Sequence, residues 1–123
     1  MYNFEMTRPS TIADAVKALQ DEDAQALGGG KTMIPTLQQR LAMPSTLVSL
    51  TGIGEMRGVC MSDAGEVCVG GATPHAVVAR EASAFPGLAA LASHIGDPAV
   101  RNRGTVGGSL ANNDPSACYP AAA

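Results

Sequence analysis

The sequence predicts an α+β protein in two lobes: a small βαβαβ unit over residues 1–52, and a second lobe that starts at residue 53 and runs to 123, with helices and an incomplete antiparallel sheet. Three observations favour this fold class. Hydrophobic residues make up 46% of the 123 residues and charged residues 15%, which suits a packed core. Helix-like and strand-like patterns alternate as far as residue 52. A hairpin signal follows them.

The first helix has a clear start. Thr11 and Asp14 resemble a capping box, in which a hydroxyl accepts early backbone N–H groups and an acid favours the positive end of the helix. Apolar residues at helical spacing extend it to about Gln20. They are Ile12, Ala15, Val16 and Leu19.

Two short strands frame the next helix. Residues 24–27 are a short apolar run that leads into glycines, and residues 46–50 are β-branched and apolar. Between them, Pro35 suits a first helical turn because proline lacks an N–H group that would be unused there. We expect this helix to reach Leu41 and to stop before Met43-Pro44.

The second lobe opens with a hairpin. Residues 58–61 and 66–70 are extended runs, and the turn between them contains Gly65, which can adopt positive φ. Helices are expected from Pro74 to about Glu81 and from Phe85-Pro86 to Ile95. Asp97-Pro98 is expected to end the second of these helices.

The last part of the chain is expected to be irregular. Residues 100–120 are rich in Gly, Asn, Arg and Pro, which predicts loop and short strand. The chain ends at Tyr119-Pro-Ala-Ala-Ala123 with no closing helix, and the second lobe has few strands to bury a sheet. We therefore expect a truncated chain.

Composition excludes several classes of function. Aromatic residues are 3% of the chain and the net charge is −3, so stacking platforms and a basic surface for nucleic acid are lacking. No signal peptide or transmembrane segment is recognisable. The three cysteines, Cys60, Cys68 and Cys118, form no CxxC pair, so we expect buried, inert thiols in a reducing cytoplasm and neither a disulfide framework nor a zinc site.

The 14 glycines are concentrated in clusters, and the first one indicates a ligand. Gly28-Gly29-Gly30-Lys31-Thr32 lies between a predicted strand and helix, where glycines let the backbone approach a phosphate closely. Two alternatives stay open. One is a tight turn without a ligand. The other is a P-loop, although Gln25 stands where that motif has its first glycine.

A second polar and glycine-rich segment covers residues 101–115. Its Thr, Ser and Asn side chains suit phosphate or sugar oxygens, and Arg101 and Arg103 are candidate phosphate partners. Two such loops fit a dinucleotide with a diphosphate link, and neither has the Rossmann spacing. His75 and His94 are expected to be half-buried structural residues. With no catalytic constellation visible, a cofactor must supply the chemistry.

These motifs together resemble the FAD-binding medium subunit of molybdenum hydroxylases, the group that contains carbon monoxide dehydrogenase and bacterial xanthine dehydrogenase-type enzymes. Gly28–Thr32 followed by Ile34-Pro35 is similar to the first flavin loop of the family. The segment from Val100 to Ser109 is similar to the second, and Asp114-Pro115 follows at the usual distance. The resemblance covers nearly the whole chain.

The resemblance implies a two-lobed PCMH-type fold with FAD between the lobes. It implies that backbone N–H groups of the two glycine segments grip the pyrophosphate, and that Asn112 and Asp114 lie near the ribityl oxygens. The implied FAD-binding residues are Gly28, Gly29, Gly30, Lys31, Thr32, Met33, Thr105, Val106, Gly107, Gly108, Ser109, Asn112 and Asp114.

The resemblance also implies partners. Electrons would come from a molybdenum cofactor on a large subunit through [2Fe-2S] clusters on an iron–sulfur small subunit, and would leave through the FAD to an external acceptor. Lys31 and Cys118 depart from the family pattern, which commonly has His or Gln at the first position and Asp at the second. A P-loop-like nucleotide enzyme and a non-catalytic assembly module are the alternatives.

Overall fold

A three-stranded parallel sheet organises the first part of the computed structural model, which describes residues 1–123. The strands are β1 (Glu5–Thr7), β2 (Ala24–Leu27) and β3 (Thr46–Ser49), in the order β1-β3-β2. β3 pairs with both neighbours, in registers that place Thr46 beside Glu5 and Ala24. The predicted strand positions and the βαβαβ unit are confirmed.

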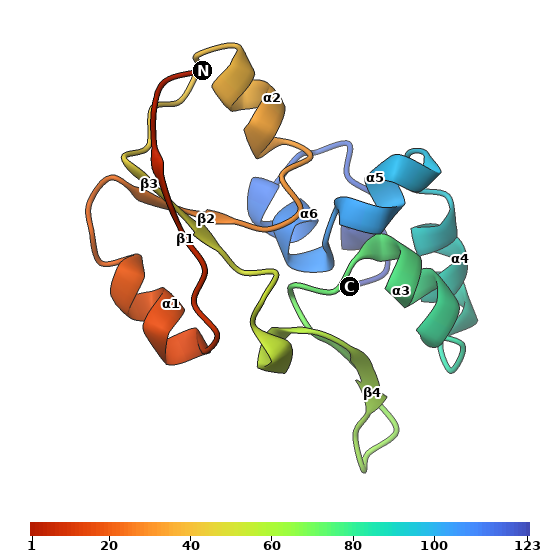
Figure 1. Cartoon of the computed structure of the whole chain (residues 1–123). Helices are drawn as coiled ribbons and strands as arrows, with labels where there is room; N and C mark the ends of the chain where they lie inside the picture. The colour runs from red at the N-terminus through yellow and green to blue at the C-terminus, as the bar shows by residue number, and fades with distance from the viewer.

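One helix covers each face of this sheet. Ala15 of α1 (Ile12–Ala18) packs with Val48, whereas Leu37 of α2 (Met33–Gln38) packs with Leu27 and Leu47. Since Leu47 and Val48 are consecutive in β3, their side chains point to opposite faces. Figure 1 shows the strands between the two helices.

The predicted cap of α1 is present, because Thr11 Oγ1 accepts the Asp14 N–H at 3.1 Å. The boundaries of α2 differ from those expected. It begins at Met33, two residues before Pro35, and ends at Gln38. Proline at the third helical position is tolerated because the N–H groups of the first turn have no intrahelical acceptor.

An antiparallel hairpin follows the parallel sheet. After the 3-10 turn η1 (Gly54–Met56), β4 (Val59–Met61) pairs with β5 (Val67–Val69), and Gly65 in the turn has φ of +83°. The predicted hairpin is therefore confirmed. In Figure 1 it projects from the body of the molecule.

Helices make up the rest of the chain, and here the sequence-based prediction is partly wrong. α3 (His75–Glu81) and α4 (Pro86–Ser93) lie as expected. Residues 100–120, expected to be loop and strand, contain most of α5 (Pro98–Arg103) and all of α6 (Val106–Asn112). The physical reason is capping: Asp97 accepts the Val100 N–H at 2.8 Å, and Thr105 accepts the Gly108 N–H at 3.1 Å.

The helical part has its own core. Val78, Ala82, Ala92 and Tyr119 are buried together, with β-hairpin residues Val59 and Val69 packed against them. Tyr119 opens the closing 3-10 turn η2 (Tyr119–Ala121) and is only 2% exposed. None of the helices is long and apolar enough to cross a bilayer.

The cysteines do not lie where the sequence suggested. Cys60, Cys68 and Cys118 are all exposed, so the expectation of buried thiols is wrong. Two of them sit on a two-stranded ribbon, which offers one face to the helices and leaves the other to solvent.

Candidate functional site

The first glycine segment lies at the carboxyl end of the parallel sheet. It connects β2 to α2, beside the end of β3, where the Leu50 N–H donates to the Leu27 carbonyl at 2.9 Å. The carboxyl ends of parallel strands are the usual place for ligands in such sheets. The fold therefore brings the predicted loop to a suitable edge.

This segment carries unpaired backbone donors. No N–H group from Gly28 to Met33 donates a hydrogen bond within the chain, and the first helical bond joins the Ile34 N–H to the Gly30 carbonyl at 3.0 Å. Gly28, Gly29 and Gly30 are half-exposed, and Lys31 and Thr32 are exposed. Consecutive free N–H groups in such a turn form a concavity that suits an anion.

The second glycine segment touches the first. A Cβ built on Gly28 would lie 2.9 Å from Thr105 Oγ1 and 3.9 Å from the Gly108 Cα. A Cβ on Gly29 would overlap the Arg103 carbonyl oxygen. Glycine is thus required at both positions for the close approach of two loops that are more than 70 residues apart in the sequence.

The backbone donors of the second segment are mostly engaged. The N–H groups of Val106 to Ser109 donate, in order, to Thr73 O (3.1 Å), Gly71 O (2.8 Å), Thr105 Oγ1 (3.1 Å) and Thr105 O (3.0 Å). The Thr105 N–H and the Ser109 hydroxyl have no partner in the chain. The resemblance implied that backbone N–H groups of both segments bind the pyrophosphate, but the free donors lie mainly in the first segment.

A buried polar scaffold holds the second segment in place. Thr73, fully buried, accepts the Gly58 N–H at 2.9 Å and donates to the Gly58 carbonyl at 3.2 Å. Next to it, the His75 N–H donates to the Gly104 carbonyl at 3.0 Å. The sequence pattern marks Thr73-Pro74 only as a helix start, and no motif indicates this supporting role of Thr73.

His75 and Tyr119 extend this scaffold to the end of the chain. His75 Nδ1 lies 2.8 Å from the Tyr119 hydroxyl. Burial lowers the pKa of His75, and burial together with Cys118 raises the pKa of Tyr119 to about 12. Both groups are therefore neutral at pH 7, which suits a structural pair.

The remaining candidate residues differ in orientation. The side chains of Met33 and Val106 pack against apolar clusters, so only their backbone can face a ligand. Asn112 ends α6 and is exposed. Asp114 is also exposed, and its carboxylate accepts the Ser116 N–H at 2.8 Å.

The two candidate arginines have different roles. Arg101 Nη1 donates to the carbonyls of Ile95 and Gly96, at 3.2 and 2.8 Å, and thereby ties α5 to the turn that follows α4. Arg103 is exposed and its side chain has no partner in the chain. Of the two, Arg103 is free to meet an anion.

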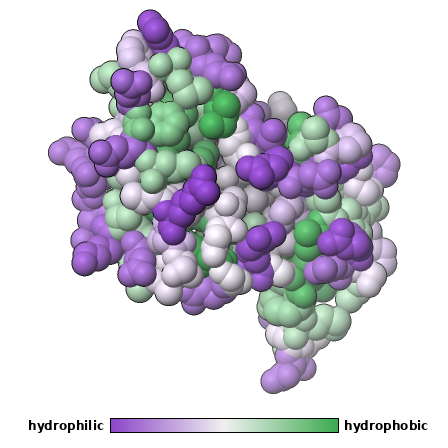
Figure 2. All heavy atoms as spheres, viewed as in Figure 1, coloured by the Kyte–Doolittle hydropathy of each residue, from purple (hydrophilic) through white to green (hydrophobic).

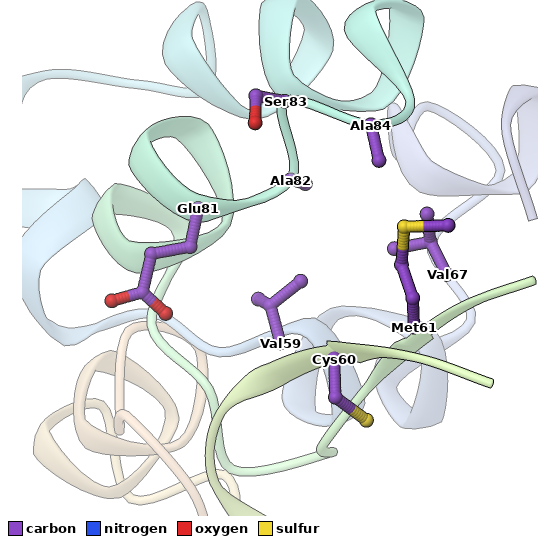
Figure 3. Close-up of a pocket in the computed structure, with 8 residues that line it drawn as sticks. All are labelled: Val59, Cys60, Met61, Val67, Glu81, Ala82, Ser83 and Ala84. Atoms are coloured by element: carbon purple, nitrogen blue, oxygen red, sulfur yellow. The ribbon is translucent and has the colours of Figure 1, made fainter.

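Other parts of the molecule do not add a catalytic group. His75 is 4% exposed, which fits a structural residue, but His94 is exposed rather than half-buried. A cavity of about 240 Å³ lies between the β4–β5 hairpin and the link from α3 to α4 (Figure 3). None of its lining residues belongs to either glycine segment.

Comparison with known proteins decides the family. A family model described as "FAD binding domain in molybdopterin dehydrogenase" matches residues 2–123. The chain belongs to this family. The two glycine segments are therefore part of a molybdopterin dehydrogenase FAD-binding domain, and the resemblance seen in the sequence is confirmed.

Individual relatives agree. The carbon monoxide dehydrogenase medium chain of Afipia carboxidovorans is 39% identical over 97% of this chain and 43% of its own length. The xanthine dehydrogenase FAD-binding subunit of Escherichia coli O157:H7 is 31% identical over 89% of this chain and 39% of its own. The chain thus spans about two fifths of the length of these relatives.

Solved structures show the same fold. A carbon monoxide dehydrogenase from Hydrogenophaga pseudoflava, which lacks the Mo-pyranopterin moiety of its cofactor, superimposes with a TM-score of 0.92 at 34% identity, covering 98% of this chain and 43% of that one. The FAD-binding domain described here therefore has the α+β PCMH-type fold that the sequence predicted.

Proposed function

We propose that the chain holds one FAD through the two glycine segments, as part of the flavin subunit of a molybdenum-containing oxidoreductase. The observation that carries this proposal is the run of unpaired N–H groups from Gly28 to Met33. They lie in a loop whose glycines allow its close approach to the second segment, and such a run of free donors fits a pyrophosphate. α2 is short, so the loop itself supplies the donors.

Each segment has its own part. Gly28 to Thr32 would bind the pyrophosphate, with Lys31 adding charge. Thr105, Gly107 and Gly108 would form the opposing wall, and the Ser109 hydroxyl would add a side-chain donor. Asn112 and Asp114 are the candidates for the ribityl oxygens. Met33 and Val106 complete the proposed set: the Met33 N–H is free, whereas the Val106 N–H already donates to the Thr73 carbonyl.

The proposed lobes are residues 1–52 and 53–123, with the FAD between them. When bound, FAD supplies redox chemistry that links one-electron carriers to a two-electron acceptor. This chain's residues bind and orient it. We infer partners of the kind that the medium chains of the family serve, an iron–sulfur small subunit and a molybdenum large subunit. The cytoplasmic location stays a prediction.

The substrate is not part of this proposal. The relatives are named for carbon monoxide and xanthine, although both are similar in sequence to this chain. A chain that binds only the flavin does not select the molecule oxidised at another subunit. The proposal is therefore limited to flavin binding and electron transfer.

The test is to purify the subunit natively, together with its partners, and to identify any nucleotide released on denaturation. One FAD for each subunit, seen by absorbance and mass, is the expected result. Bound ATP that depends on magnesium would support the P-loop alternative instead. A folded protein with no nucleotide would support the assembly module.

A further inference from the structure

The β4–β5 hairpin places two cysteines directly opposite each other, since its register pairs Cys60 with Cys68. The Gly70 N–H donates to the Gly58 carbonyl at 2.9 Å, two residues away from this pair on both strands. Hydrogen-bonded pairs recur every two residues in an antiparallel ladder. Cys60 and Cys68 are therefore such a pair, with a Cα separation of about 5.5 Å.

Both thiols point to the solvent face of the hairpin. Val59 and Val69, the neighbours of the two cysteines, pack against the helical core, so alternation turns Cys60 and Cys68 the other way. Both cysteines are exposed. Figure 3 shows Cys60 directed away from the cavity that Val59 and Met61 enter. Figure 2 shows the projecting arm of the hairpin as a hydrophobic surface that ends in a hydrophilic tip.

The electrostatics agree with close thiols. Partial desolvation raises the pKa of Cys68, and the neighbouring Cys60 thiol and the Glu66 carboxylate raise it further. Cys118 is not part of this arrangement, because it precedes η2 at the other end of the helical region. The chain thus has one facing pair of thiols and one separate thiol.

We propose that Cys60 and Cys68 form a site of reversible oxidative modification, where a low-molecular-weight disulfide converts the two thiols into an intrachain disulfide. One cysteine thiolate attacks a sulfur of oxidised glutathione, which forms a mixed disulfide and releases one glutathione. The second cysteine loses its proton to solvent and attacks the mixed disulfide, which releases the other glutathione. Two thiols are oxidised and one disulfide is reduced.

Geometry explains why the bond forms and why it reverses. A Cα separation of about 5.5 Å is within the range for disulfides. In a hydrogen-bonded pair, however, the Cβ atoms stand about 4.5–5.5 Å apart, farther than the mean of about 3.8 Å in disulfides. The resulting strain and the exposure make the bond easy to reduce, as in labile disulfides.

The test uses oxidised glutathione on the native protein at about pH 8.5, the pKa of a free cysteine thiol. After alkylation and trypsin, residues 58–80 form one peptide, and Cys118 lies in a separate peptide that begins at Gly104, because Arg57, Arg80 and Arg103 precede the cuts. The expected 58–80 peptide is lighter by two hydrogen atoms, resists alkylation, and regains both thiols with dithiothreitol. The peptide with Cys118 should carry only glutathione.

Two controls test whether the disulfide forms because the folded hairpin holds the two thiols together or only because they are close in the sequence. Cys60→Ser and Cys68→Ser should each keep one glutathione on the 58–80 peptide and form no internal bond. Closure of the mixed disulfide should be at least about tenfold faster in the native protein than in urea. Equal closure rates, or two glutathiones retained on the native 58–80 peptide, would overturn the proposal.

Discussion

His75 Nδ1 and the Tyr119 hydroxyl oxygen lie 2.8 Å apart, and this bond ties the last turn of the chain to the segment that holds the second glycine loop. The His75 N–H also donates to the Gly104 carbonyl. His75 Nε2 lies so close to Gly104 that a Cβ there would be 2.7 Å away. The pair is thus a structural support of the proposed FAD site rather than part of it.

Removing the Tyr119 hydroxyl should lower stability. Tyr119→Phe leaves the buried Nδ1 of His75 without a partner, which costs about 1–3 kcal/mol in the free energy of unfolding. Urea unfolding at pH 7 measures this change in the free energy of unfolding. Tyr2→Phe is the matched control, because Tyr2 is exposed and its ring faces only Arg40. Equal stability of both variants would show that the bond contributes nothing.

The same hydroxyl predicts a loss of stability in alkali. The pKa of Tyr119 rises from 10.0 to about 12 on folding, so between these values the folded chain keeps a proton that the unfolded chain releases. Stability should therefore decrease as pH rises from 10 to about 12. Tyr119→Phe should flatten this part of the curve of unfolding free energy against pH. If the slope of unfolding free energy against pH stayed the same in Tyr119→Phe, groups other than Tyr119 would cause the loss of stability.

The lowered pKa of His75 predicts a loss of stability in acid. Burial lowers its pKa below 6.5, so as pH falls from 6.5 the unfolded chain binds a proton before the folded chain does. Stability is therefore complete above about pH 6.5 and is lost as pH falls toward the lowered pKa. Urea unfolding at pH 5.5 and 7.5 should give a smaller difference for His75→Gln than for the unchanged protein, whereas His94→Gln, at an exposed position, should keep the full difference.

The sequence predicts local structure well where one residue decides it. Thr11 caps α1, Gly65 forms the hairpin turn, and the strands end where the apolar runs end. α5 and α6 were missed because Gly, Asn and Pro lowered their helix propensity. Asp97-Pro98 is in fact an N-cap followed by proline at the first helical position, a signal that was available.

The site was predicted only in its residue types. Glycine clusters identify both segments. Their contact, however, depends on backbone hydrogen bonds between distant parts of the chain, which a single sequence does not reveal. Gly107 lies against the Gly71 carbonyl, and Val106 against that of Thr73, so α6 begins with its N–H groups already engaged. Which segment offers free donors is a property of the tertiary structure.

The contact between the two segments can be measured by a double-mutant cycle on Gly28→Ala and Thr105→Ala. Gly28→Ala brings a Cβ within 2.9 Å of Thr105 Oγ1, and Thr105→Ala removes the cap of α6 at a cost of about 1 kcal/mol. Without Oγ1, the alanine at 28 meets no close side chain. The double variant should thus lose less stability than the sum, by about 0.5–3 kcal/mol. Strict additivity would mean that the segments do not touch.

Lys31 should strengthen FAD binding through charge alone. Its side chain is exposed and forms no ion pair, so Lys31→Gln should leave stability unchanged. FAD affinity should decrease by roughly fivefold at low salt, about 1 kcal/mol, and the difference should shrink as salt rises. Fluorescence titration at two salt concentrations measures it. Lys17→Gln, on α1, is the control and should bind FAD as the unchanged protein does.

Gly29 provides the strictest test of the proposed site. A Cβ at this position would overlap the Arg103 carbonyl oxygen, which is backbone and cannot rotate away, so Gly29→Ala must separate the two segments. FAD retention should decrease at least about tenfold. Gly54→Ala is the matched control, since a Cβ there meets nothing within 4 Å. Circular dichroism should show that both variants keep their fold. If folded Gly29→Ala retained stoichiometric FAD, the flavin would not depend on the close approach of Gly29 to Arg103.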